Sequence, residues 1–199
     1  MEILELEKLK KEFINIFETN IHREGGKDLL DWILNSDFFE APASTRYHLN
    51  EKGGLLLHSI NVYHNLIQEY EFMKSCHPKM KDYSLDCLAL VALCHDLCKC
   101  NFYSVEMRNA KDEFGQWVKV PYYTIDDTFP LGHGEKSMYI VQSFVKLSGE
   151  EALSLRWHMG GFDDAVKGGS YSQSQAFSKC PLAVLLHIAD MKATYFNEV

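Results

Sequence analysis

The chain has 199 residues, of which 46% are hydrophobic, and a formal net charge of -8 at pH 7. This size and apolar content suffice for one buried core, so we expect a single domain over residues 1–199. The negative charge disfavours a broad track for duplex nucleic acid, because such a surface needs clustered Lys and Arg.

Export and membrane insertion are also disfavoured. The first residues are acidic and amphipathic rather than a basic stretch followed by an apolar run, and the longest apolar stretch, 88–94, is too short to cross a bilayer. We therefore expect a cytoplasmic protein with no membrane partner. In that setting the six cysteines favour buried, packed thiols over a disulfide framework.

Helical periodicity dominates the first half of the chain. Apolar residues recur at spacings of three and four from 3 to 17, which predicts an amphipathic first helix. A short helix should follow over 27–35, and Pro42 and Gly53-Gly54 indicate a loop over 36–54. Two further helices are expected, over 55–72 and 84–98, the second with a nearly continuous apolar face.

The helical period disappears between 102 and 128, where turn residues at 111–115 and an alternating segment at 116–120 predict a small β-hairpin. Its aromatic residues either stack on a nucleobase or pack the hairpin on the helices.

Helices are expected again over 135–147 and from the capping box of Ser148 and Glu151 to about residue 158. Glycine and serine indicate a loop over 160–178, and Pro181 opens a last helix. The predicted fold is all-α with a small β-hairpin insertion. Its core spans about 49–196, and the helices of 1–48 pack on that core.

Histidine and aspartate occupy unusually apolar positions in two of these helices. His95 and Asp96 come at the end of the most apolar segment, and Asp190 lies among Leu, Ile, Ala and Met. A buried carboxylate without a partner costs several kcal/mol, so a bound metal ion would explain both aspartates.

Three segments, 53–59, 93–99 and 187–190, resemble in order and spacing the signature segments of the HD-domain metal-dependent phosphohydrolase superfamily. Their sequences are Gly-Gly-Leu-Leu-Leu-His-Ser, Leu-Cys-His-Asp-Leu-Cys-Lys and His-Ile-Ala-Asp. His133 and His158 fall where the two-metal branch of that superfamily carries two further histidines. The similarity extends over about 49–196.

The resemblance implies two divalent transition-metal ions (Fe, Mn, Ni, Co or Zn) joined by Asp96. The first ion would be held by Asp96 together with His58, His95 and Asp190, and the second by Asp96, His133 and His158. Two such ions lower the pKa of a shared water and stabilise charge on an attacked phosphate. Asp96 and Lys99 are the catalytic candidates, although Lys99 is also explained as a solvated cation at a helix end.

Other residues are weaker candidates for substrate contacts. Arg46 and His48 lie near the mouth of the expected site or are ordinary loop residues. Lys136 and Lys192 are candidate phosphate contacts, and Asp163 is a candidate for orienting a bound water or a ligand histidine.

These features predict a metal-dependent phosphohydrolase that uses metal-bound hydroxide to cleave a nucleotide or related small phosphate ester. The alternative is a single-strand-specific nuclease, with short single-stranded nucleic acid as its partner. We favour the small substrate, because the chain has no room for a separate nucleic-acid-binding module. A non-catalytic metal-binding module is a third reading, and the sequence leaves the oligomeric state open.

Overall fold

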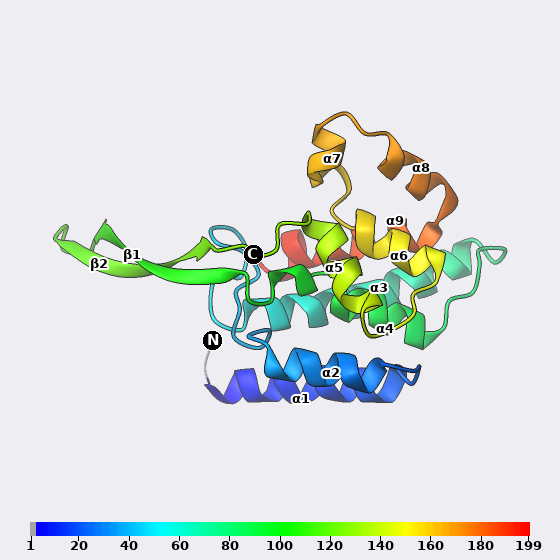
Figure 1. Cartoon of the computed structure of the whole chain (residues 1–199), viewed down its shortest axis with the longest axis horizontal. Coiled ribbons are helices and arrows are strands. Elements are labelled where there is room, and N and C mark those ends of the chain that lie inside the picture. Colours follow the sequence, from blue (N-terminus) through cyan, green and yellow to red (C-terminus); the bar gives the residue numbers. More distant parts are fainter. Residues whose placement is uncertain (1–2) are drawn as a thin grey trace.

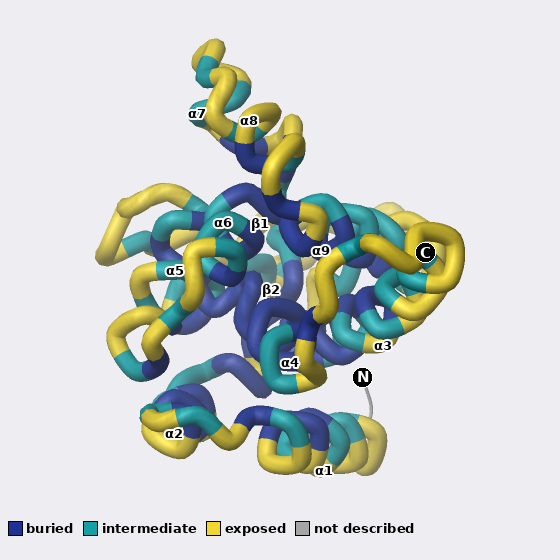
Figure 2. The backbone as a smooth tube through the Cα atoms, turned by 90° about the vertical axis from the view of Figure 1, so that its right-hand side faces the viewer, coloured by how far each residue is buried: buried dark blue, intermediate teal, exposed yellow. Residues whose placement is uncertain are grey.

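The computed structural model describes residues 3–199. This part of the chain folds mainly into α-helices, with one two-stranded sheet (Figure 1). The expected fold class, mainly helical with a small β-hairpin, is confirmed. Helix α1 (Ile3–Asn20) and α2 (Gly26–Asn35) form a layer along one side of the other helices (Figures 1 and 2).

Helix α4 (Leu85–Cys94) lies at the centre. Ser84 caps its first turn by accepting a hydrogen bond from the amide of Cys87, and every residue from Leu88 to Cys94 is fully buried. Helices α3 (Gly54–Cys76) and α6 (Gly149–Trp157) contact α4, and both also contact α9 (Pro181–Lys192). Helix α5 (His133–Gln142) packs on α6. The helices that carry the candidate ligands therefore surround one core.

The layer of α1 and α2 joins this core through aromatic packing. The ring centroids of Phe13 and Phe38 lie 4.9 Å apart, and Phe39 meets Phe13 edge to face. Phe13 and Phe17 belong to the same hydrophobic cluster as α4. The described residues of α1 thus pack on the core.

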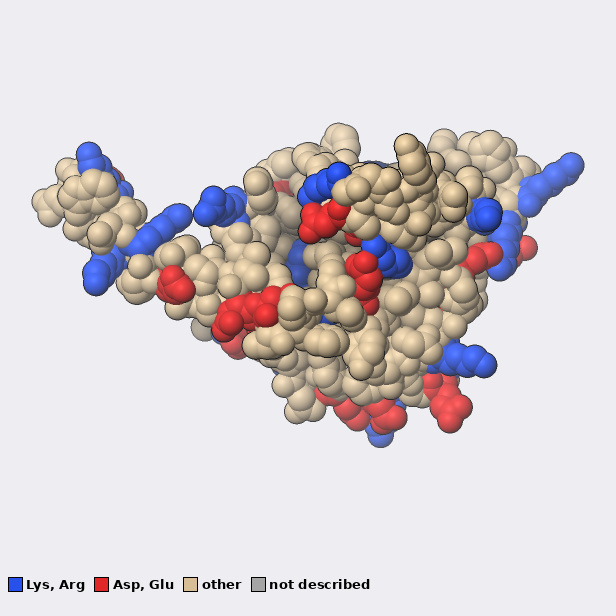
Figure 3. Space-filling model, turned by 45° about the horizontal axis from the view of Figure 1, so that its top comes forward, with Lys and Arg blue, Asp and Glu red and all other residues tan. Residues whose placement is uncertain are grey.

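The hairpin is longer than predicted. Strands β1 (Tyr103–Lys111) and β2 (Trp117–Ile125) pair antiparallel, and their turn is held by Asp112, whose carboxylate accepts from the amides of Phe114 and Gln116. The hairpin projects from the helical body as an arm (Figures 1 and 3). Periodicity alone located only part of β2, because both strands are largely exposed and lack a strict apolar alternation.

Other element boundaries also differ. Helix α4 ends at Cys94, not near 98, and a 3-10 turn, Leu97–Lys99, follows it. Helix α3 runs on to Cys76, whereas α5 stops at Gln142.

The expected loop at 160–178 contains two short helices, α7 (Asp164–Lys167) and α8 (Ser172–Lys179). Asp163 caps α7, and α8 packs on α9 with Ala176 buried. This capping and packing stabilise helices in a segment whose glycine content predicted a loop.

Within residues 3–199 no helix is long and apolar enough to cross a membrane. All six cysteines are free.

We predict that Glu151 links the stability of the fold to pH. It completes the capping box of α6 with Ser148 and pairs with Arg23 at 2.8 Å, with only 3% of its side chain exposed. Burial alone would raise the pKa of Glu151, but the bonds from Arg23 and Ser148 lower it overall. Its ionisation therefore contributes stability above about pH 4.5, the ordinary value, and that contribution is lost as the pH falls through the lower folded-state pKa.

Glu151→Gln should lower the free energy of unfolding in urea by about 2 kcal/mol at pH 7, and by less in acid. Glu40→Gln is the control, because its pair with Lys52 is largely exposed and such pairs contribute about 0.5 kcal/mol. An equal loss for Glu151→Gln at pH 7 and pH 3 would contradict this assignment.

Candidate metal centre

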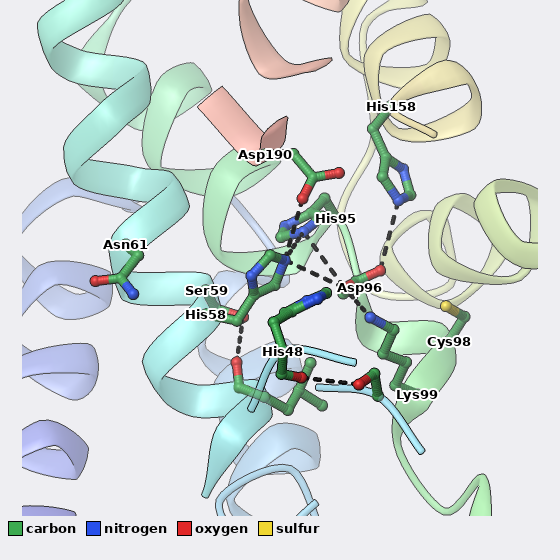
Figure 4. Close-up of polar contacts among 12 residues, drawn as sticks. His48, His58, Ser59, Asn61, His95, Asp96, Cys98, Lys99, His158 and Asp190 are labelled. Carbon is green, nitrogen blue, oxygen red and sulfur yellow. Dashed lines mark hydrogen bonds and ion pairs between the residues drawn. The ribbon is translucent and has the colours of Figure 1, made fainter. Parts of the chain in front are cut away.

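The six predicted ligands lie in or directly after five helices and converge on one point. Figure 4 labels five of them, all except His133. His58 lies in α3 and Asp190 in α9, while His133 is the first residue of α5. His95 and Asp96 follow α4 directly, and His158 follows α6 in the same way. Placing ligands at helix ends lets elements that run in different directions share one centre.

Glycines permit the close approaches that this arrangement needs. Gly53 has a positive φ of 81° where α3 begins, and a Cβ on Gly54 would lie 2.1 Å from the carbonyl oxygen of Leu49. A Cβ on Gly134 would lie 2.2 Å from the carbonyl oxygen of Arg156. Any larger residue at 134 would push α5 from α6 and separate His133 from His158.

The histidines after α4 and α6 have the same orientation. His95 Nδ1 donates to the carbonyl oxygen of Ala92 at 2.7 Å, and His158 Nδ1 donates to that of Leu155 at 2.8 Å. A carbonyl oxygen only accepts, so the proton of each neutral ring is on Nδ1 and the lone pair is on Nε2. Burial lowers the pKa of His95 to about 4, which keeps that ring neutral. His158 Nε2 is buried and has no hydrogen-bond partner in the described structure.

His58 is held between two carboxylates. Its Nδ1 donates to Glu198 at 3.0 Å, and its Nε2 lies 3.3 Å from Asp190 Oδ1. Burial alone would lower the pKa of His58, but Asp190 and Glu198 raise it to about 9. Such a carboxylate on Nδ1 orients the ring and strengthens Nε2 as a metal ligand.

The spacing of these donor atoms fits a metal ion. Two nitrogen or oxygen ligands at about 2.0–2.1 Å from a tetrahedral zinc lie roughly 3.3 Å from each other. His58 Nε2 lies 3.2 Å from His95 Nε2 and 3.3 Å from Asp190 Oδ1. These spacings, together with a buried His158 Nε2 that makes no hydrogen bond in the described structure, show that the residues present suit a bound cation.

Asp96 is the shared anion of the centre. Its side chain is 4% exposed, with Lys99 Nζ at 2.6 Å from Oδ2 and His133 Nε2 at 2.7 Å from Oδ1. Burial alone would raise the pKa of Asp96, but Lys99, His95 and His133 hold it well below its usual value. Burial alone would lower the pKa of His133, but the Cys98 sulfur and the Asp96 carboxylate raise it to about 10.

Overlapping groups of buried and partly buried side chains could thus hold a metal ion. Each offers donor atoms within 4.8 Å of one another. The groups among the described residues are His58, His95 and Asp190; His95, Asp96 and His158; Asp96, Cys98 and His133; and His48, His58 and Glu198.

A pocket of about 870 Å³ opens onto this centre. Arg46, His48 and Lys99 line it, so the structure brings these three predicted substrate contacts to the site. His48 lies with its ring 5.2 Å from that of His58, and burial and the nearby His58 lower its pKa.

Three predicted contacts are not brought to the pocket, because each has another partner. Lys136 Nζ pairs with Asp127 at 2.6 Å, and Lys192 Nζ pairs with Glu69 at 2.6 Å. Asp163 caps α7 and pairs with Arg156 at 2.7 Å. We therefore do not retain Lys136, Lys192 and Asp163 as substrate contacts.

Sequence reasoning missed two residues of the centre. Glu198 follows a π-helical turn, Ala193–Asn197, which alters the helical register in a way that no periodicity reveals. Cys98 was assigned to packing with the other thiols, but its sulfur lies 3.5 Å from the ring nitrogens of His133. The pocket lining also includes several residues that no motif marked, namely Tyr47, Phe162, Lys167, Thr194 and Tyr195.

Comparison with known proteins adds no assignment: no family model, curated protein or solved structure matches the chain.

Metal binding should stabilise the fold. At a free metal concentration of 100 times Kd, one site contributes about 2.7 kcal/mol, which corresponds to a rise in Tm of roughly 5–10 °C for a chain of this size. His58→Ala should remove most of the shift. His64→Ala should retain it, because His64 is half exposed on the same helix and pairs with Glu12. Differential scanning fluorimetry across Mn²⁺, Co²⁺, Ni²⁺ and Zn²⁺ measures this, and equal shifts in both variants would place the metal elsewhere.

Proposed function

We propose that this chain is a metal-dependent phosphohydrolase of the HD-domain type, acting on a nucleotide or related small phosphate ester in the cytoplasm. The observation that carries the proposal is the convergence of three histidine Nε2 atoms with the buried carboxylate of Asp96 and the partly buried carboxylate of Asp190 at metal-ligand spacings. Of these residues, His58, Asp96 and Asp190 line a pocket. A pocket of about 870 Å³ suits a ligand of nucleotide size.

The two ions of the proposal would share Asp96. His58, His95 and Asp190 would complete the first position, and His133 and His158 the second. When bound, such ions supply a water of lowered pKa and positive charge opposite the phosphate. Asp96 presents Oδ1 toward His133 and His158 and Oδ2 toward His58 and His95, the arrangement expected of a carboxylate shared by two ions. Lys99 also contacts Oδ2.

The remaining site residues would orient and neutralise the phosphate. Lys99 is 13% exposed and reaches the pocket from the same turn as Asp96, and Arg46 lies on the exposed rim. The cationic side chains of Lys99 and Arg46 would neutralise the phosphate of the bound substrate through charge-assisted hydrogen bonds. His48 Nε2 is buried without a hydrogen-bond partner in the described structure and lies 3.7 Å from Glu198 Oε2, and His48 would contact substrate as part of the pocket lining.

Ligand count separates the two positions. Asp96→Ala should abolish hydrolysis and reduce total metal sharply, because both ions lose a ligand. His133→Ala should mainly empty the second position, since the first keeps four protein ligands. Metal content per chain and hydrolysis rate, measured on the same preparations, test this. Full activity and unchanged metal content in His133→Ala would reduce the site to one ion.

Arg46→Ala should raise KM for a nucleotide about 10-fold with a smaller change in kcat, because one charge-assisted hydrogen bond contributes roughly 1.5–3 kcal/mol. Lys52→Ala is the matched control: Lys52 lies six residues along the chain, is exposed and pairs with Glu40 outside the pocket. A screen of nucleotides supplies the substrate. Equal KM values for both variants would remove Arg46 from the site.

A nuclease remains the second candidate, favoured by the hairpin arm. Trp117 is 71% exposed with Lys111 Nζ 5.4 Å from its ring centroid, and Arg108 lies over Tyr122. Aromatic and cationic pairs of this kind stack and neutralise single strands. The nuclease reading predicts that Trp117→Ala impairs cleavage of single-stranded oligonucleotides and that mononucleotides are not turned over. The favoured reading predicts higher kcat/KM for the mononucleotide and no effect of Trp117→Ala on it.

A further inference from the structure

The three thiols of the segment 94–100 do not share one environment. Cys94 and Cys100 belong to the hydrophobic core cluster. Cys98 is equally buried, at 3% exposed, but stands outside that cluster and lies beside Asp96 and Lys99 (Figure 4). Core packing therefore explains two of these thiols and leaves the third unexplained.

The contacts of Cys98 point to the second metal position. Its sulfur lies 3.5 Å from both ring nitrogens of His133, and its backbone amide donates to Ser137 on the same helix as His133. The donor atoms of Asp96, Cys98 and His133 all lie within 4.8 Å of one another. Leu97, between Asp96 and Cys98, is fully buried in the core, which anchors the turn that carries both donors.

The distances match a thiolate and an imidazole on one ion. Zinc binds sulfur at about 2.3 Å and imidazole nitrogen at about 2.0–2.1 Å, so the two donors of a tetrahedral site lie roughly 3.5 Å apart. The observed separation of the Cys98 sulfur and His133 is 3.5 Å.

We propose that the Cys98 sulfur is a ligand of the second metal position, together with Asp96 and His133. This inference rests on the metal centre of the proposed function. The thiol releases its proton to solvent when the sulfur binds the cation, because cysteine coordinates as thiolate.

A thiolate changes which metal the second position prefers. Imidazole with thiolate suits zinc, iron or cobalt, whereas manganese and magnesium favour oxygen-rich sites. The first position, with imidazole and carboxylate ligands alone, carries no such bias. The two positions of one centre would therefore differ in metal preference, with the softer metal beside Cys98.

Cobalt substitution tests the ligand directly, because a thiolate bound to Co²⁺ produces a charge-transfer band in the near ultraviolet that nitrogen and oxygen ligands do not. Titration of the metal-free full chain with Co²⁺ should produce this band. Cys98→Ser should lose it and bind one Co²⁺ equivalent at least about 10-fold more weakly, with little change in Mn²⁺ affinity. Cys100→Ala, a buried thiol of the same segment, should keep the band.

Each outcome decides a separate point. Cobalt binding by the wild-type chain without the band, or a band that persists in Cys98→Ser and disappears in Cys100→Ala, overturns the role of Cys98 and leaves the proposed function standing. Failure of the wild-type chain to bind Co²⁺ at all overturns the proposed metal centre itself. Circular dichroism of both variants confirms that each remains folded, and Cys98→Ala provides a second loss of the sulfur should Cys98→Ser unfold.

Discussion

The burial of Asp96 is the constraint on which the rest of the site depends. An ionised carboxylate taken out of water costs several kcal/mol unless charges and hydrogen bonds compensate it. Here the pKa of Asp96 is held well below its usual value although its side chain is 4% exposed. Lys99 and His133 provide the direct contacts, and His95 and His158 stand within 3.5 Å. One lysine and three histidines therefore surround the two oxygens of Asp96. Such a cluster of imidazoles around a buried carboxylate offers several donor atoms to a metal ion.

Most of the residues that surround Asp96 lie at the ends of helices rather than on their faces. His95 and His158 each follow the last residue of a helix and bond back to a carbonyl three residues earlier, so a local backbone rule aims both lone pairs at Asp96. Gly134 then allows α5 to approach α6 and delivers His133 from the other side. The convergence of these side chains therefore depends partly on the geometry at the helix ends and partly on the small size of Gly134.

The sequence was informative where histidine or aspartate stood in an otherwise apolar helical segment. His58, His95, Asp96 and Asp190 were predictable because polar ligands in apolar helices need a reason to be there, and the structure brings them together. The partners of the lysines were not predictable, because the periodicity does not show which side chains meet: Lys136 pairs with Asp127 in the loop before its helix, and Lys192 pairs with Glu69 on a different helix. Glu198 was not predicted because a π-helical turn alters the helical register before it. Cys98 was not predicted because it lies in an apolar segment, where a thiol that contacts His133 cannot be distinguished from one that packs in the core.

Anomalous diffraction from crystals grown with Mn²⁺ or Zn²⁺ tests the central claim most directly. The account predicts two anomalous peaks about 3.5–4 Å apart on either side of Asp96, one beside His58 and Asp190 and the other beside His133. With metal present, the direct contact between His133 and Asp96 should open to admit the ion. Crystals saturated with metal that show no peak within bonding distance of Asp96, and that retain its contact with His133, would contradict it.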